Sequence, residues 1–182
     1  MKLRQMVAAG MLAALTAVVT RMIQIPSPAT NGYINAGDIV ILFSSYYAGP
    51  LAGFFIGGAG SALADILSGY PFYYVTFIIK GIEGIIAGAL PRYFNGEAVL
   101  NNENSADEKL SAAVRFLAAV ICGAVFMVAG YFCFHILVYG RPKAYMSLPG
   151  NIFQALAGVL GSLILFKKGP VRLLKDIYQN NK

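Results

Sequence analysis

Long apolar segments alternate with short polar stretches along the whole chain. A helix rises about 1.5 Å per residue, so about 20 apolar residues cross the ~30 Å hydrocarbon layer of a bilayer. Turn signals such as Pro26, Gly49-Pro50 and Ser68-Gly69 interrupt the segments. The pattern predicts an all-α membrane protein, a single domain of six transmembrane helices joined by loops. The approximate bounds of the predicted spans are residues 3–25, 38–48, 51–67, 73–91, 116–139 and 151–166.

The composition supports a membrane protein. Of the 182 residues, 58% are hydrophobic and only 12% are charged, whereas soluble domains are about 25% charged. The net charge of +6 comes from basic residues that mostly flank the apolar segments. These residues therefore indicate membrane topology, and binding to nucleic acid is not expected.

The basic residues also predict the orientation. If the N-terminus is inside, the outer segments hold only Arg21, Arg141 and Lys143. The inner segments then hold Lys2, Arg4, Arg92, Lys109, Arg115, Lys167, Lys168, Arg172, Lys175 and Lys182. Lys and Arg concentrate on the cytoplasmic side of membrane proteins, so both termini are predicted to be cytoplasmic.

The fourth predicted span carries two opposite charges near its middle. Lys80 and Glu83 are three residues apart and share one face of a helix. Each would cost ~2.5 to 3.5 kcal/mol at the centre of a bilayer, so this face must meet protein, water or a ligand. A structural ion pair and a binding role both remain open. Asp38 leaves similar alternatives, because it stands at a helix start, where a carboxylate can cap free N–H groups.

Polar residues of several predicted spans lie at one common depth. In the predicted orientation they fall in the outer half of the bundle, whereas the inner halves are apolar. This distribution predicts a pocket that opens outward and is closed below. The candidate substrate-binding residues are Asn35, Asp38, Asp65, Tyr73, Lys80, Glu83, His135, Asn151 and Gln154.

Catalytic and metal-binding motifs are missing from the sequence. His135 is the only histidine and has no accompanying cluster of His and Cys, so we expect it to form hydrogen bonds and expect no metal or cofactor. The chain has no HExxH, GxSxG or P-loop motif, so no enzymatic activity is predicted. ATP-driven transport would therefore require separate ATPase subunits.

Small residues recur along the first predicted span. Ala9, Ala13 and Ala17 are spaced by four residues and form one stripe. Such a stripe lets two helices pack closely, either inside the bundle or against a second membrane protein. The spacing alone leaves both interpretations open.

The chain resembles the S component, the substrate-capture subunit, of energy-coupling-factor (ECF) vitamin transporters. The resemblance rests on this alanine stripe and on three motifs, and it extends over almost the whole chain. The motifs are YINAGD at 33–38, SALADILSGY at 61–70 and FIIKGIEGIIAG at 77–88. The chain is most similar to the branch of riboflavin, hydroxymethylpyrimidine and pyridoxine carriers, and its lack of tryptophan disfavours the thiamine branch.

The resemblance implies a mechanism and partners. An S component holds its vitamin under the first and second outer loops, here Ser27–Gly37 and Ser68–Phe72. Ala9, Ala13 and Ala17 match the segment that docks on a transmembrane coupling subunit, which two ATPase subunits drive. The resemblance also implies that the subunit topples in the lipid bilayer to release its cargo inside. We expect it in the plasma membrane of a bacterium.

The polar residues also bear on the cargo. Three acids near Lys80, together with tyrosines in the outer loops, favour a small polar heteroaromatic molecule. We expect a vitamin B6 form (pyridoxine, pyridoxal or pyridoxamine), with riboflavin and hydroxymethylpyrimidine as alternatives. The rival from another class is a self-sufficient secondary carrier. Such a carrier would need polar residues through the full depth and usually an internal repeat, and the sequence shows neither.

Overall fold

The computed structural model describes residues 1–27, 32–95, 106–169 and 171–178. Helices dominate this part of the chain, as expected for an all-α membrane protein. They are α1 (Leu3–Met22), α2 (Gly37–Ala48), α3 (Pro50–Ser68), α4 (Tyr73–Asn95), α5 (Ala106–Lys168) and α6 (Val171–Tyr178). Two short strands, β1 (Gln24–Ser27) and β2 (Gly32–Asn35), lie between α1 and α2.

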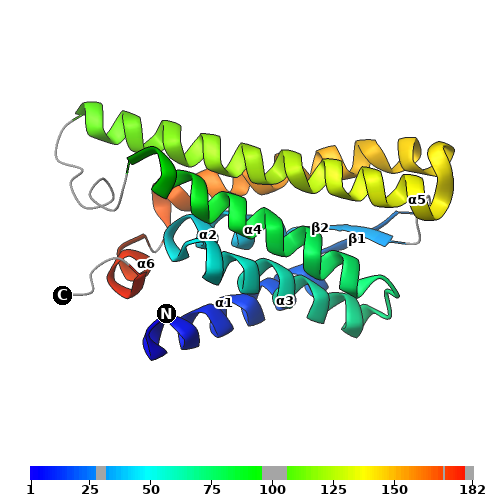
Figure 1. The fold of residues 1–182 in the computed structure, drawn as a ribbon, viewed down its shortest axis with the longest axis horizontal. Coiled ribbons are helices and arrows are strands. Elements are labelled where there is room, and N and C mark those ends of the chain that lie inside the picture. The colour runs from blue at the N-terminus through cyan, green and yellow to red at the C-terminus, as the bar shows by residue number, and fades with distance from the viewer. Residues whose placement is uncertain (28–31, 96–105, 170, 179–182) are drawn as a thin grey trace.

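Four helical segments among the described residues are long and apolar enough to cross a membrane. They are Leu3–Met22, Pro50–Ser68, Tyr73–Tyr93 and Ser111–Lys168. The last has 58 residues and would be roughly 90 Å long if straight, about three times the hydrocarbon thickness. It instead has two halves that turn at Gly140, whose φ of 79° lies in the left-handed region. Figure 1 shows the chain reversing direction at this turn.

The prediction of a loop over residues 140–150 is wrong. Gly140 alone makes the reversal, and the chain is helical again directly after it. Pro142 lies in the first turn of the second half, where the missing N–H of proline leaves no helical hydrogen bond unmade. The glycine and proline that indicated a loop in the sequence therefore mark one sharp turn.

The polar segment after α1 forms a β-hairpin rather than the predicted loop. α1 ends at Met22, before the predicted residue 25, because the chain continues as β1. The two strands pair antiparallel, with Gln24 opposite Asn35 and Ile25 opposite Ile34. We call β1 and β2 together the hairpin. It lies at one end of the bundle and leads directly into α2.

Glycines allow α3 and α4 to pack very closely. A Cβ added at Gly53 would lie 2.4 Å from the carbonyl oxygen of Gly84, and one at Gly84 would lie 2.1 Å from that of Gly53. A Cβ at Gly57 would lie 2.2 Å from the carbonyl oxygen of Lys80. Backbones this close leave no space for side chains, as is typical of small-residue contacts between membrane helices. The contact fixes Asp65 of α3 relative to Lys80 of α4.

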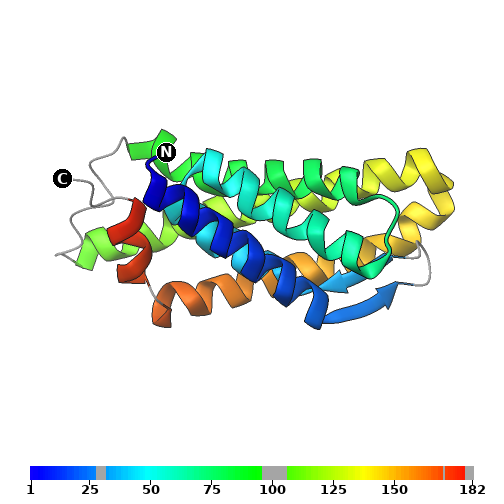
Figure 2. The ribbon, with the colours of Figure 1, turned by 90° about the horizontal axis from the view of Figure 1, so that it is seen from below.

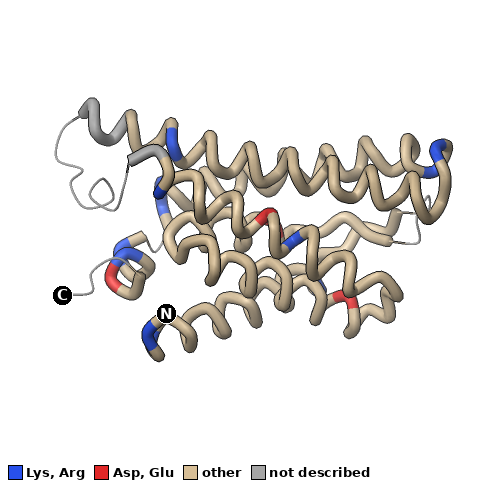
Figure 3. Tube along the Cα trace, in the orientation of Figure 1, with Lys and Arg blue, Asp and Glu red and all other residues tan. Residues whose placement is uncertain are grey.

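The two ends of the bundle differ in chemistry. Figures 1 and 2 show the start of α1 and α6 at one end, and the hairpin with the turn of α5 at the other. Aromatic side chains fill the core near α6, where Phe116 and Phe166 stack 4.4 Å apart and Tyr46 packs on both. Leu174 of α6 is buried in the same cluster. Figure 3 shows most Lys and Arg residues at the ends of the bundle.

Candidate functional site

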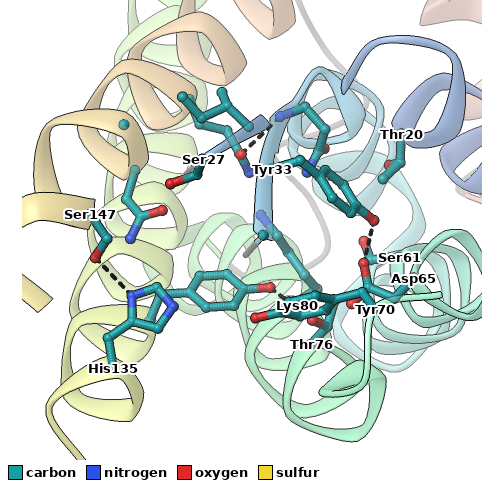
Figure 4. A pocket seen from close by; sticks show the side chains of 17 residues that line it. Thr20, Ser27, Tyr33, Ser61, Asp65, Tyr70, Thr76, Lys80, His135 and Ser147 are labelled. Carbon is teal, nitrogen blue, oxygen red and sulfur yellow. Dashed lines mark hydrogen bonds between the residues drawn. The ribbon is translucent and has the colours of Figure 1, made fainter. Parts of the chain in front are cut away.

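A cavity lies beneath the hairpin, among α1, α3, α4 and both halves of α5 (Figure 4). Its water-accessible volume is about 50 Å³. The lining consists of Thr20, Ser27, Gly32, Tyr33, Ile34, Asn35, Ser61, Asp65, Tyr70, Thr76, Lys80, Tyr131, His135, Ser147, Gly150, Asn151 and Gln154. Most of these residues carry hydrogen-bonding side chains, in contrast to the aromatic core near α6.

A buried cluster of charges lies beside the cavity and reaches its lining through Lys80. Lys80 donates hydrogen bonds to Asp38 of α2 and to Glu83 of α4, the latter at 3.0 Å from Nζ to Oε2. All three side chains are at most 2% exposed. An unpaired buried ion costs several kcal/mol, and the ammonium of Lys80 offsets part of this cost for the two carboxylates. The ion pair that the sequence left open is present, and Lys80 also borders the cavity.

Gln154 connects this charge cluster to the hairpin. Its Nε2 donates a hydrogen bond to Asp38 Oδ2 at 3.0 Å, and its Oε1 accepts one from the backbone N–H of Asn35 at 3.0 Å. Asn35 Oδ1 in turn accepts a hydrogen bond from the backbone N–H of Gly37 at 2.9 Å. One amide side chain therefore joins β2, α2 and the second half of α5.

The hairpin is also bound to α3. The Tyr33 hydroxyl donates a hydrogen bond to Asp65 Oδ1, and Gln24 Nε2 donates one to Ser68 Oγ at 2.8 Å. Burial, and next the nearby Asp65 charge, raise the pKa of Tyr33 well above its usual value. Burial likewise raises the pKa of Tyr70. Both phenols therefore stay neutral at physiological pH and can donate hydrogen bonds.

His135 and Ser147 pair across the turn of α5. His135 Nδ1 lies 2.8 Å from Ser147 Oγ, and the Ser147 hydroxyl donates to the carbonyl oxygen of Ala144 at 2.8 Å. Serine has a single hydroxyl proton, so Nδ1 must be the donor to Ser147. A neutral imidazole then presents Nε2 as a hydrogen-bond acceptor. The two halves of α5 thus orient a ring that borders the cavity.

Three polar atoms of the cavity lining are buried without a hydrogen-bond partner among the described residues. They are Thr20 Oγ1, Asp65 Oδ2 and Asn151 Nδ2. Buried polar atoms are nearly always paired, with water or a ligand where the protein offers no partner. No group of three or more His, Cys, Asp or Glu side chains that could hold a metal ion occurs in the described segments.

The structure separates the predicted substrate-binding residues into three groups. Those that line the cavity are Asn35, Asp65, Lys80, His135, Asn151 and Gln154. Asp38 and Glu83 are buried against Lys80 and lie outside the lining. Tyr73 also lies outside the lining. It is 44% exposed, and its ring packs on that of Tyr74 at the start of α4. We therefore do not place Tyr73 in the site.

Several lining residues were not among the predicted substrate-binding residues. Thr76 lies one turn before Lys80, and the hydroxyl of Tyr131, one turn before His135, donates to Thr76 Oγ1 at 3.2 Å. Their helical spacing from Lys80 and His135 was a usable signal. Thr20 has no such signal in the sequence, and Ser147 fell in the segment that was predicted as a loop.

The alanines predicted for partner docking mostly face the bundle. Ala9 and Ala17 are each 4% exposed, and Ala9 packs with Ala52 of α3. A Cβ added at Gly60 of α3 would lie 2.6 Å from the carbonyl oxygen of Ala13. In this structure the alanine stripe therefore forms an internal contact between α1 and α3.

Comparisons with known proteins match nearly the whole chain. The family model described as "ECF-type riboflavin transporter, S component" matches residues 1–169. A Pyrococcus woesei protein, described as an uncharacterized protein in the gap 3′ region, is 34% identical over 160 residues, which cover 85% of this chain and 97% of that relative. A UPF0397 protein of Streptococcus pneumoniae (strain Hungary19A-6) is 36% identical over 91 residues, 50% of each chain. The resemblance seen in the sequence is confirmed, and the chain belongs to the S component family of ECF-type riboflavin transporters, a family of transporter components and not of enzymes.

Proposed function

We propose that the protein captures a vitamin for an ECF importer and binds it in the cavity beneath the hairpin. One observation carries the proposal: charged and hydrogen-bonding side chains enclose a cavity at one end of an otherwise apolar membrane protein. Ionisable residues inside membrane proteins usually mark substrate or ion pathways. Because the other end has an aromatic core, the arrangement fits capture from one side of the membrane.

The size of the cavity favours a small cargo. A water molecule needs about 10 to 15 Å³ of water-accessible volume, so a cavity of about 50 Å³ holds about four waters. This space is closer to a compound with one ring than to the three fused rings of riboflavin. We therefore propose a vitamin B6 form as the cargo. The family to which the chain belongs supports riboflavin as the alternative, and hydroxymethylpyrimidine, which has one ring, is another.

The lining also suits a hydroxylated aromatic ring. The rings of Tyr33 and Tyr70 meet edge to face with centroids 6.3 Å apart, and Tyr131 also lines the cavity. Aromatic side chains offer both stacking surfaces and hydroxyl donors. His135, Asn151 and Thr20 add polar atoms that can meet hydroxyl groups or a ring nitrogen.

The orientation follows from the charge distribution. We propose that the hairpin faces outward and that α6 and the start of α1 face the cytoplasm, with both termini cytoplasmic. The basic residues at the start of α1, at the end of α5 and in α6 support this orientation by the positive-inside rule. The chain would then cross the cell membrane six times, with each half of α5 as one crossing and α2 as the shortest.

The proposed partners are a transmembrane coupling subunit and two ATPase subunits. Because Ala9 and Ala17 pack inside the bundle, we assign docking to the exposed side of the same helix. Gly10 and Ala14 are exposed there, and a Cβ at Gly10 would meet nothing within 4 Å. Small residues four apart on an exposed face let a partner helix approach closely.

Calorimetric titration of the purified protein in detergent tests the capture role. We expect pyridoxine, pyridoxal or pyridoxamine to bind with a Kd below about 1 μM, corresponding to about 8 kcal/mol of binding free energy. Riboflavin and hydroxymethylpyrimidine serve as the comparison ligands. Tighter binding of either would reassign the cargo, and no binding by any of them would refute vitamin capture in this cavity.

Reconstitution separates the proposed role from that of a secondary carrier. Liposomes with the protein alone should bind the vitamin but show no accumulation under an ion gradient. Liposomes that contain the protein together with the coupling subunit and both ATPases should accumulate the vitamin when ATP is supplied on the side of the membrane where the ATPases lie. Accumulation by the protein alone would favour the carrier.

A further inference from the structure

The charges around the cavity are unevenly balanced. Lys80 is the one Lys or Arg in the described lining, and its ammonium already contacts the carboxylates of Asp38 and Glu83. Asp65 adds a third carboxylate, which has a hydrogen bond from Tyr33 but no Lys or Arg contact among the described residues. The site therefore holds no uncompensated positive charge that could receive an anion.

The unpaired atoms of the lining specify which groups a ligand must offer. Asp65 Oδ2 is buried with no hydrogen bond to the described residues, and a carboxylate oxygen accepts hydrogen bonds from O–H or N–H donors. In the neutral ring that donates from Nδ1 to Ser147, His135 Nε2 is also an acceptor. Asn151 Nδ2 is a donor with no partner among the residues that the structure describes. A ligand with O–H or N–H groups and one acceptor matches this set.

From these two observations we infer that the cavity selects a neutral or cationic ligand whose O–H or N–H group binds Asp65, and that it rejects the phosphate esters of the same compound. This inference rests on the proposed capture role, which it makes more specific. A phosphate would bring two negative charges toward Asp65 in a poorly hydrated site. At a separation of about 5 to 6 Å and an effective dielectric constant of about 20, the repulsion between even one pair of like charges lowers the affinity about 100-fold.

Titrations with matched pairs of ligands test the inference on the unmodified protein. The pairs are pyridoxal and pyridoxal 5′-phosphate, riboflavin and its 5′-phosphate, and hydroxymethylpyrimidine and its phosphate. For whichever vitamin binds, we expect its phosphate ester to bind at least about 100-fold more weakly. Equal affinity for ester and free vitamin would overturn the inference but leave vitamin capture intact. A lack of binding by every compound would overturn both.

A charge-removing variant identifies the group responsible. Asp65→Asn keeps the shape of the side chain, and we expect it to weaken binding of the free vitamin by about tenfold or more, because one charged acceptor is lost. In this variant the affinities for the free vitamin and for its phosphate ester should differ by less than about tenfold. An unchanged difference would refute the role of Asp65.

The control removes the same charge at the other end of the molecule. Asp176 lies on α6, where Tyr178 binds the backbone of Gln5, whereas Thr20 of the cavity lies 15 residues further along α1. Fifteen helical residues span roughly 22 Å, so Asp176→Asn should change neither affinity. If Asp65→Asn does not fold, the ligand pairs on the unmodified protein still decide the inference.

Discussion

Lys80 of α4 donates a hydrogen bond to Asp38 of α2, and this buried pair joins residues that are 42 positions apart in the chain. Glu83 shares the same ammonium from one helical turn further along α4. These three charges are thus a connected group that holds α2 and α4 together at the edge of the cavity.

Removing the lysine should destabilise the fold. Lys80→Met leaves the carboxylates of Asp38 and Glu83 buried without a cation, and we expect a loss of about 3 to 5 kcal/mol in the free energy of unfolding. Thermal unfolding in detergent measures this loss. The double variant Lys80→Met/Asp38→Leu is the control, because it removes both partners and should lose less than the sum of the single variants. Additive losses would contradict a direct interaction.

The glycine contact between α3 and α4 should not tolerate a methyl group. Gly84→Ala would place a Cβ 2.1 Å from the carbonyl oxygen of Gly53, so we expect a loss of about 1 to 3 kcal/mol in stability. Gly10→Ala is the matched control, because a Cβ there meets nothing within 4 Å and alanine favours helix by up to about 1 kcal/mol. Equal melting temperatures for the two variants would refute the close contact.

Two alanines of α1 should respond differently to enlargement. Ala17→Leu inserts a large side chain where the native residue is 4% exposed, and we expect a loss of about 1 to 3 kcal/mol in stability. Ala14→Leu lies on the exposed side and should leave stability and vitamin binding unchanged, but prevent co-purification with the coupling subunit. Full assembly by Ala14→Leu would show that the partner docks elsewhere.

Alkaline pH should weaken the attachment of the hairpin. Burial and the Asp65 charge raise the pKa of Tyr33 in the folded protein. The hydrogen bond of Tyr33 therefore stabilises the fold fully below about pH 10, the usual pKa of tyrosine, and this stabilisation decreases as the pH rises further. Tyr33→Phe removes this contribution. We expect the variant to melt lower at pH 7 and the difference from the unmodified protein to shrink above pH 10. A constant difference across this range would contradict the prediction.

The sequence predicted well those features that depend on one helix at a time. Apolar length predicted the long helices, and the spacing of Lys80 and Glu83 predicted that they share a face. The partnership of Lys80 with Asp38 could not be derived, because it depends on how α2 packs beside α4. The alanine stripe had the same difficulty: its spacing fits an internal or an external contact equally, and Gly60 of α3 provides the internal one.

Short or irregular elements were the main source of error. Each strand of the hairpin has four residues and β1 contains Pro26, which disfavours a strand except at a sheet edge. Thr20 was missed because hydroxyl residues are common in membrane helices, where they can bond to their own backbone. Ser147 was missed because it fell in the predicted loop, whereas in the structure it is helical and bonds to the carbonyl oxygen of Ala144. Only the fold shows that both also border the cavity.

The direct backbone contact between Gly53 and Gly84 also has a mechanical consequence. Two helices whose backbones touch have few side chains between them that could change rotamer and allow the helices to slide. The two helices should therefore move as one rigid unit. Asp65 lies on one helix of that unit and Lys80 on the other. If the subunit tilts as a whole to deliver its cargo, these two groups would keep their separation during the tilt.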